Sequence, residues 1–201
     1  MTPTFAEERA SPQPVCGVDE AGRGPLAGPV VAAAVILDPD AIPDGLSDSK
    51  MLSASRRDIL FGKIEASAEV GVGVVGVAHI ERLNILWATM LAMERAVDAL
   101  AIHPAMTLID GNRAPRWKRP CRTIVKGDAK CHSIAAASIV AKVTRDRMMA
   151  ELDARHPGYG WSRNQGYGTA EHLAALVKLG PTAHHRAGFA PVRAALAKSA
   201  R

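Results

Sequence analysis

The chain of 201 residues has few cysteines and no apolar run long enough to cross a membrane. Cys16, Cys121 and Cys131 are odd in number and lack the paired spacing of zinc ligands. This argues against a disulfide framework and a zinc site and favours a reducing compartment, so we expect a cytoplasmic protein. The N-terminus also lacks the basic and then apolar pattern of a secretory signal.

After residue 14 the sequence shows no linker and no internal repeat that would divide it into separate domains. Residues 1–14 have the proline, serine and glutamate content of a mobile tail. With 48% hydrophobic residues, the remainder can bury a full core. We therefore expect a single domain over residues 15–201, preceded by a mobile N-terminal tail.

Positive charge is scarce in the first half of the chain and abundant in the second. Residues 1–112 carry 8 lysines and arginines against 15 acids, whereas residues 113–201 carry 17 against 5. A basic half favours a polyanionic partner. No basic amphipathic helix with a bulky apolar face stands out, so nucleic acid is favoured over a membrane.

Short apolar runs alternate with helical periodicity along the chain. The patterns predict strands at 15–20, 30–37, 70–78, 106–110 and 122–125. They predict helices at 53–68, 85–101, 133–154, 169–180 and 191–199, with Ser53 or Ser55 and Thr169 as caps. Glycines in the third strand make it narrow enough for close helix packing. The mixture predicts one α/β domain with a helical C-terminal portion.

Four acidic residues stand where solvated acids are not expected: Asp19, Glu20, Asp110 and Asp128. Asp19 and Asp110 close buried strands, and Asp128 precedes a helix. Converging carboxylates need cations, and Mg²⁺ or Mn²⁺ fits their oxygens. Two such ions about 3.5–4 Å apart assist phosphodiester hydrolysis. Each aspartate alone is better explained as a cap or solvated turn. Glu20 would reach the same site as Asp19 only if the strand ends or bulges.

The Gly22-Arg23-Gly24 motif follows the first acids and suits close approach to a phosphodiester. A hairpin turn with solvated acids is the alternative. Tyr167 lies between two glycines, a poor place for a core aromatic, so it either contacts substrate or anchors its turn. Further candidate phosphate contacts are Lys50, Lys126, Arg145 and Arg163.

Three further positions allow two interpretations. His184 and His185 suggest a metal site, but a surface or phosphate contact is favoured. Trp161 could stack on a ligand, but packing is slightly favoured. The Arg145-Asp146-Arg147 end of the 133–154 helix is expected to face water.

Taken together, these motifs resemble bacterial ribonuclease HII over residues 16–192, nearly the whole chain. The resemblance implies the ribonuclease H-like fold, a mixed central sheet flanked by helices with a helical C-terminal extension. The segments that carry it are GVDEAGRGPLAGPVV, SDSK, LNILWATMLAMERAV, LIDGN, VKGDAK, SIAAASIVAKVTRDR, GYGT and the HHR–GF–PV run.

The resemblance also implies the function and the site. The family's metal-binding catalytic quartet falls on Asp19, Glu20, Asp110 and Asp128; its ribonucleotide-reading motif on Gly22, Arg23 and Gly24; its junction-sensing tyrosine on Tyr167. Such enzymes use two divalent ions, Mn²⁺ or Mg²⁺, to hydrolyse RNA in RNA/DNA hybrids. They also incise 5′ to ribonucleotides embedded in DNA, leaving 3′-hydroxyl and 5′-phosphate ends, and so remove misincorporated ribonucleotides. We expect Lys50 to bind substrate and the protein to be a monomer.

Some positions depart from the family pattern. The usual DSKKL has Met51 in place of a lysine, and the usual HRRSF has Ala187 and Gly188. The related ribonuclease HIII has an extra N-terminal domain, for which the first 14 residues leave no room, so HII is preferred. Two other functions fit the sequence less well. A non-catalytic nucleic-acid-binding module would not explain the acids. A phosphatase of small phosphoesters would not explain the glycine-rich loops.

Overall fold

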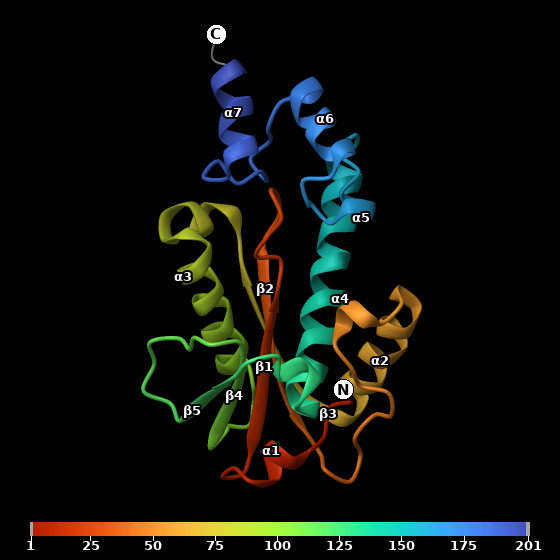
Figure 1. The fold of residues 1–201 in the computed structure, drawn as a ribbon, viewed down its shortest axis with the longest axis vertical. Coiled ribbons are helices and arrows are strands. Elements are labelled where there is room, and N and C mark those ends of the chain that lie inside the picture. Colours follow the sequence, from red (N-terminus) through yellow and green to blue (C-terminus); the bar gives the residue numbers. More distant parts are fainter. Residues whose placement is uncertain (1, 200–201) are drawn as a thin grey trace.

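The computed structural model describes residues 2–199 and is built around one five-stranded sheet of order β3-β2-β1-β4-β5 (Figure 1). Strands β1, β2 and β3 form an antiparallel meander, whereas β4 and β5 run parallel to β1. The mixed sheet predicted from the sequence is therefore confirmed. The strands are β1 (Val15–Ala21), β2 (Val30–Leu37), β3 (Ala68–Val75), β4 (Met106–Asp110) and β5 (Cys121–Ile124).

Helices cover both faces of the sheet. Helix α3 packs on one face, α4 packs on the other, and α2 packs on α4. Helices α5 to α7 form the helical C-terminal extension, which lies beyond the C-terminal end of α4 (Figure 1). The helices are α1 (Ala6–Arg9), α2 (Ala54–Ser67), α3 (Val77–Asp98), α4 (His132–Arg155), α5 (Trp161–Asn164), α6 (Ala170–Leu179) and α7 (Ala190–Ser199), with 3₁₀ turns η1 (Ser49–Met51) and η2 (Gly127–Ala129). None of these helices, over residues 2–199, is both long and apolar enough to span a bilayer.

Strand β3 packs closely against α3 through its glycines, as predicted. A Cβ added to Gly71 would lie 2.1 Å from the Ala96 carbonyl oxygen, and one added to Gly73 would lie 2.0 Å from that of Ala92. The predicted boundaries were less accurate, because the strand ends at Val75 and the helix begins at once. The chain breaks helical geometry at Asn84, where φ is 65° and the side chain accepts from two later amides. The predicted 85–101 helix is therefore the second half of α3.

Predicted caps lie where the sequence placed them. The Ser53 hydroxyl accepts a hydrogen bond from the Arg56 amide at the start of α2, and Thr169 accepts from His172 at the start of α6. Helix α6 ends at Gly180, whose φ of 77° favours glycine. These ends follow from local hydrogen bonding and were therefore predictable from the sequence.

The N-terminal segment contacts the body of the protein, which the expectation of a mobile tail over residues 1–14 did not foresee. The amide of Thr4 donates to the Lys130 carbonyl, and its own carbonyl accepts from His132. The carboxylate of Glu8 is buried and accepts from the amide and hydroxyl of Ser133, at 2.8 and 2.7 Å. The physical reason is that the first turn of α4 has amides without intrahelical partners, which a carboxylate satisfies.

Candidate active site

Three carboxylates meet where β1, β4 and η2 come together. One carboxylate oxygen from each of Asp19, Asp110 and Asp128 lies within 4.8 Å of the other two. The parallel pairing of β1 with β4 ends at Val18 and Ile109, so Asp19 and Asp110 follow side by side. Because alternate residues of a strand share a face, both aspartates point to the face that α4 covers. Asp128 joins them there from the turn that precedes α4.

The cluster is short of positive charge. Burial, followed by the charges of Glu20 and Asp110, raises the pKa of Asp19 well above its usual range. Burial and the charge of Asp110 also raise the pKa of Asp128. Three close carboxylate oxygens with such shifts are a donor set that fits a hard divalent cation. Lys50 lines the same cleft as Asp19. Burial lowers the pKa of its ammonium, but the charges of Asp48 and of the three clustered aspartates outweigh burial, and the net shift is upward.

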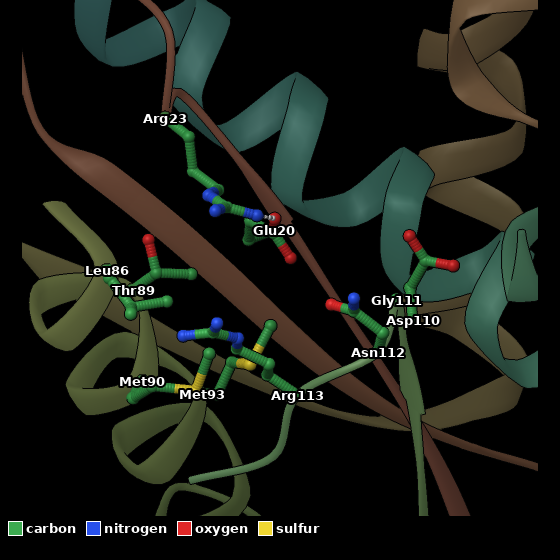
Figure 2. Close-up of a pocket in the computed structure, with 10 residues that line it drawn as sticks. All are labelled: Glu20, Arg23, Leu86, Thr89, Met90, Met93, Asp110, Gly111, Asn112 and Arg113. Carbon is green, nitrogen blue, oxygen red and sulfur yellow. Dashed lines mark hydrogen bonds and ion pairs between the residues drawn. The ribbon is translucent and has the colours of Figure 1, made fainter. Parts of the chain in front are cut away.

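Glu20 lies apart from the group of three. Strand β1 pairs regularly with β2 through Ala21, so the strand neither ends nor bulges at the acids. Glu20 therefore points to the opposite face from Asp19. Its carboxylate forms an ion pair with Arg23 at 3.1 Å. In Figure 2 this pair lies on one side of a pocket whose other side includes Asp110.

A cleft of about 460 Å³ contains most of the remaining predicted site residues. Tyr167 is 49% exposed there, and a Cβ added to Gly24 would lie 3.3 Å from its ring. Two loops far apart in the sequence therefore meet at this position. The predicted site residues that line the cleft are Asp19, Glu20, Gly22, Arg23, Gly24, Lys50 and Tyr167.

Two residues to which the sequence assigned no role in the site line the pocket of Figure 2. Asn112 and Arg113 directly follow Gly111, at the end of β4, and the Arg113 side chain extends toward Met90 and Met93 of α3. Their position two and three residues after Asp110 was the signal that could have indicated them.

Other predicted phosphate contacts lie elsewhere. Arg163 is exposed and forms an ion pair with Glu171, and Lys126 is exposed at the turn before Asp128. Neither Arg163 nor Lys126 is among the described residues that line the cleft. Arg145 does line it, but only 1% of the residue is exposed, so the prediction that the 145–147 segment faces water is wrong at that residue.

Histidines and aromatic rings form a buried cluster in the C-terminal extension. Trp161 is fully buried and its Nε1–H donates to His172 Nε2 at 3.0 Å, which confirms packing. His185 is 3% exposed, so the favoured surface or phosphate contact is wrong. Its Nδ1 accepts from the Thr182 amide, so its Nε2 carries the proton that it shares with His172 Nε2 at 3.1 Å. His172 Nδ1 then donates to the Tyr167 carbonyl at 2.9 Å.

This cluster makes the stability of the protein depend on pH. Burial, and then the charge of His172, lowers the pKa of His185 from 6.5 to about 4. Between these values the unfolded chain binds more protons than the folded chain, so the free energy of unfolding falls as the pH falls. We expect the thermal midpoint to drop over this window, and to drop less steeply in His185→Asn.

The measurement is the slope of the unfolding midpoint against pH, from about pH 7 to about pH 4, for both proteins. Exposed His103 supplies the control, because His103→Asn should keep the wild-type slope. Equal slopes for wild type and His185→Asn would contradict the assignment of a neutral buried imidazole.

A mixed sheet with a flanking helix on each face and an acidic cluster where the pairing of β1 with β4 ends defines a nuclease of the ribonuclease H-like class. The model of the ribonuclease HII family matches residues 16–192, and the chain belongs to that family. It is therefore a ribonuclease H hydrolase, of a family that cleaves RNA/DNA hybrids and depends on divalent metal ions. The preference for HII over HIII is confirmed.

Individual relatives agree with this assignment. Ribonuclease HII of Rhizorhabdus wittichii is 63% identical over 190 residues, which cover 94% of each chain. That of Burkholderia vietnamiensis is 61% identical over 183 residues, covering 90% of this chain and 85% of the relative. Among solved structures, ribonuclease H2 from Pyrococcus horikoshii has a TM-score of 0.79 at 26% identity and covers 93% of this chain and 99% of its own.

Proposed function

We propose that this enzyme incises duplex DNA on the 5′ side of an embedded ribonucleotide, as well as hydrolysing the RNA strand of a hybrid. The products would carry 3′-hydroxyl and 5′-phosphate ends, and the biological role would be removal of misincorporated ribonucleotides. The observation that carries the proposal is the convergence of Asp19, Asp110 and Asp128 beside a cleft lined by the Gly22-Arg23-Gly24 loop and Tyr167. We also propose that the enzyme acts as a monomer.

The carboxylates would hold the metal ions. Asp19, Asp110 and Asp128 offer oxygens to Mg²⁺ or Mn²⁺, and Glu20 faces the adjoining pocket with Asp110. When bound, two divalent ions supply Lewis-acid stabilisation of the charge that develops on the phosphodiester. Without a cation, burial and the neighbouring negative charges keep the pKa of Asp19 raised, so cation binding and folding stability are linked.

The remaining cleft residues would position the substrate. Lys50, beside the acids, would contact a backbone phosphate, and Arg23 is held near the cleft by its ion pair with Glu20. Only the 2′-hydroxyl distinguishes a ribonucleotide from a deoxyribonucleotide at a given position. Backbone groups at Gly22 and Gly24 permit a closer approach to that hydroxyl than a side chain would.

A cleavage assay tests this function directly. A 5′-labelled DNA duplex with one ribonucleotide is incubated with Mg²⁺ or Mn²⁺, beside an uninterrupted hybrid and an all-DNA duplex. We expect cleavage of the first two only, and a DNA polymerase should extend the 3′ end of the product. No cut at the embedded ribonucleotide, or an end that cannot be extended, would contradict the proposal.

Tyr167 should contribute strongly to recognition of the junction. Its ring is half exposed, beside Gly24, where it could lie against the sugar that follows the ribonucleotide. A deoxyribose leaves room for the ring, whereas a 2′-hydroxyl would crowd it. Aromatic contacts of this type are worth about 1–3 kcal/mol, so Tyr167→Ala should lose roughly tenfold to a hundredfold in kcat/KM.

Tyr167→Phe separates shape from hydrogen bonding. It should keep most of the activity if the ring alone suffices, and much less if the hydroxyl binds a phosphate. The measurement is kcat/KM for wild type and both variants on the single-ribonucleotide duplex and on the uninterrupted hybrid. If Tyr167→Ala cuts both as wild type does, the tyrosine only anchors its turn.

A further inference from the structure

A fully buried arginine lies beneath the Gly22-Arg23-Gly24 loop. Arg186 has no exposed surface, and its guanidinium donates only to backbone carbonyl oxygens. Nη2 donates to Gly22 at 2.7 Å, and Nη1 donates to Arg23 at 3.0 Å and to Pro25 at 2.8 Å. The same group also donates to Gly28 and, at 3.2 Å, to Pro29. One side chain of the C-terminal extension thus holds most of the loop over residues 22–29.

A second buried arginine connects this loop to the one that carries Tyr167. Arg145 of α4 donates through Nε to the Pro29 carbonyl at 3.0 Å and through Nη2 to that of Ala27 at 3.2 Å. Its Nη1 donates to Gln165 at 3.0 Å. The planar fork of a guanidinium can make all three bonds at once, whereas the single nitrogen of a lysine cannot span them.

The two loops also touch directly. The Leu26 amide donates to the Gly166 carbonyl at 2.8 Å. A Cβ on Gly166 would lie 2.7 Å from the Ala27 carbonyl oxygen, and one on Gly22 would lie 2.0 Å from Arg145 Nε. The two loops therefore lie in close contact, and the Arg145 side chain fills the space beside Gly22.

Neither arginine has a carboxylate partner within the described residues. Burial lowers the pKa of Arg145 to about 10 and that of Arg186 to about 9, so both stay charged at neutral pH. Two charges buried without acids are costly to retain. Their side chains donate to six of the eight carbonyls of loop 22–29, while the Gly24 amide has no acceptor among residues 2–199. That amide stays available at the cleft.

We propose that Arg145 and Arg186 are positioning residues that hold loop 22–29 and loop 165–167 in one register. The two loops then act as one reading surface, on which the glycine-rich motif meets the ribonucleotide and Tyr167 meets the next sugar. This inference rests on the proposed function of the same cleft. It assigns specificity to two side chains that need not touch the substrate.

Arg186→Lys and Arg145→Lys test the inference, because each keeps a positive charge and loses the fork. The measured quantity is the ratio of kcat/KM on a single-ribonucleotide duplex to kcat/KM on an uninterrupted hybrid. A displacement of about 1 Å at a reading group costs up to a hundredfold, so we expect the ratio to fall about tenfold or more. Lower stability alone reduces the folded fraction and lowers both rates by the same factor.

Two control variants separate these effects. Arg193→Lys changes an exposed arginine of α7 and should leave the ratio unchanged. Leu60→Ala destabilises the core between α2 and the sheet and should lower the unfolding midpoint without changing the ratio. Circular dichroism at the assay temperature establishes which variants are folded.

The outcomes are distinct. A folded Arg186→Lys protein with the wild-type ratio overturns the inference. If that variant does not fold, Arg145→Lys decides in the same way, and failure of both to fold would make the arginines core components and also overturn it. A wild-type enzyme that cuts hybrids but not the single-ribonucleotide duplex would instead contradict the proposed function.

Discussion

Asp19→Asn and Asp110→Asn should abolish cleavage while the protein stays folded. Each removes one of three carboxylates whose oxygens lie within 4.8 Å of one another. A bound divalent ion contributes several kcal/mol to stabilising the transition state, and each 1.36 kcal/mol is a factor of ten. We therefore expect kcat to fall by about a thousandfold or more. Duplex affinity should stay near the wild-type value or rise, because negative charge is removed beside a phosphate.

Asp19→Asn should also raise the stability of the folded protein when divalent ions are removed. The pKa of Asp19 is raised by burial and by neighbouring acids, so the ionised carboxylate destabilises the folded state at neutral pH. A neutral amide removes that cost. Asp19→Asn should therefore unfold at a higher temperature than wild type in a chelator, and it should gain less stability when Mg²⁺ is added.

Asp44→Asn provides the matched control, because this aspartate is exposed in a loop away from the cluster. It should keep both the turnover and the response to Mg²⁺. Turnover of Asp19→Asn or Asp110→Asn near the wild-type rate in saturating Mg²⁺ would show that these carboxylates do not form the metal site. A chelator-treated Asp19→Asn protein less stable than wild type would contradict the electrostatic argument.

Gly17→Ala should strongly destabilise the protein. A Cβ there would lie 2.2 Å from the backbone carbon of Ser133 and 2.3 Å from the Ile134 nitrogen. Backbone atoms cannot rotate away, so β1 and α4 must separate. Overpacking in a core commonly costs 1–3 kcal/mol, and we expect ~3 kcal/mol or more here. For a domain of this size that lowers the unfolding midpoint by roughly 10 °C.

The separation should also reduce activity in the protein that remains folded. Asp19 belongs to β1, whereas Asp128 lies in the turn just before α4. Moving α4 away from β1 therefore moves Asp128 away from Asp19. The measurements are the midpoint temperature of thermal unfolding and kcat at temperatures below the unfolding transition. We expect both values to be lower in Gly17→Ala than in wild type.

Gly62→Ala is the control for this glycine substitution. Gly62 lies inside α2, and a Cβ there would have no heavy atom within 4 Å. Replacing an unconstrained helical glycine by alanine should stabilise the protein by roughly 0.5–1 kcal/mol. A Gly17→Ala protein as stable as wild type would mean that β1 and α4 are packed less tightly than the structure indicates.

The sequence by itself determined the features that depend on neighbours along the chain. The run from Val30 to Leu37 predicted a strand, and Ser53 or Ser55 predicted the start of α2, of which the structure uses Ser53, because periodicity and capping are local. The position of Asp110 after an apolar run correctly predicted the end of β4, whereas β1 continues for two residues beyond Asp19. The residue pattern was specific enough to indicate the ribonuclease HII family before any contact was known.

Only the tertiary structure decided which charged side chains are buried. Arg145 stands beside an aspartate and another arginine in a helix, a pattern typical of a solvated face, and no local signal predicted its burial. Its partners are carbonyls of Ala27, Pro29 and Gln165, the first two more than 100 residues away in the sequence. The hydrogen-bond partners of buried Arg186 and buried Glu8 are also more than 100 residues away in the sequence.

The physical reason is the same in each of these cases. A charged group is buried only where hydrogen bonds replace its hydration, and those bonds come from whichever backbone the fold brings near. The regular pairing of β1 decided the direction of Glu20 in the same manner, since the sequence allowed either a strand end or a continuous strand. Local patterns thus determined the elements and the acids, and long-range backbone contacts decided how the cleft around them is held.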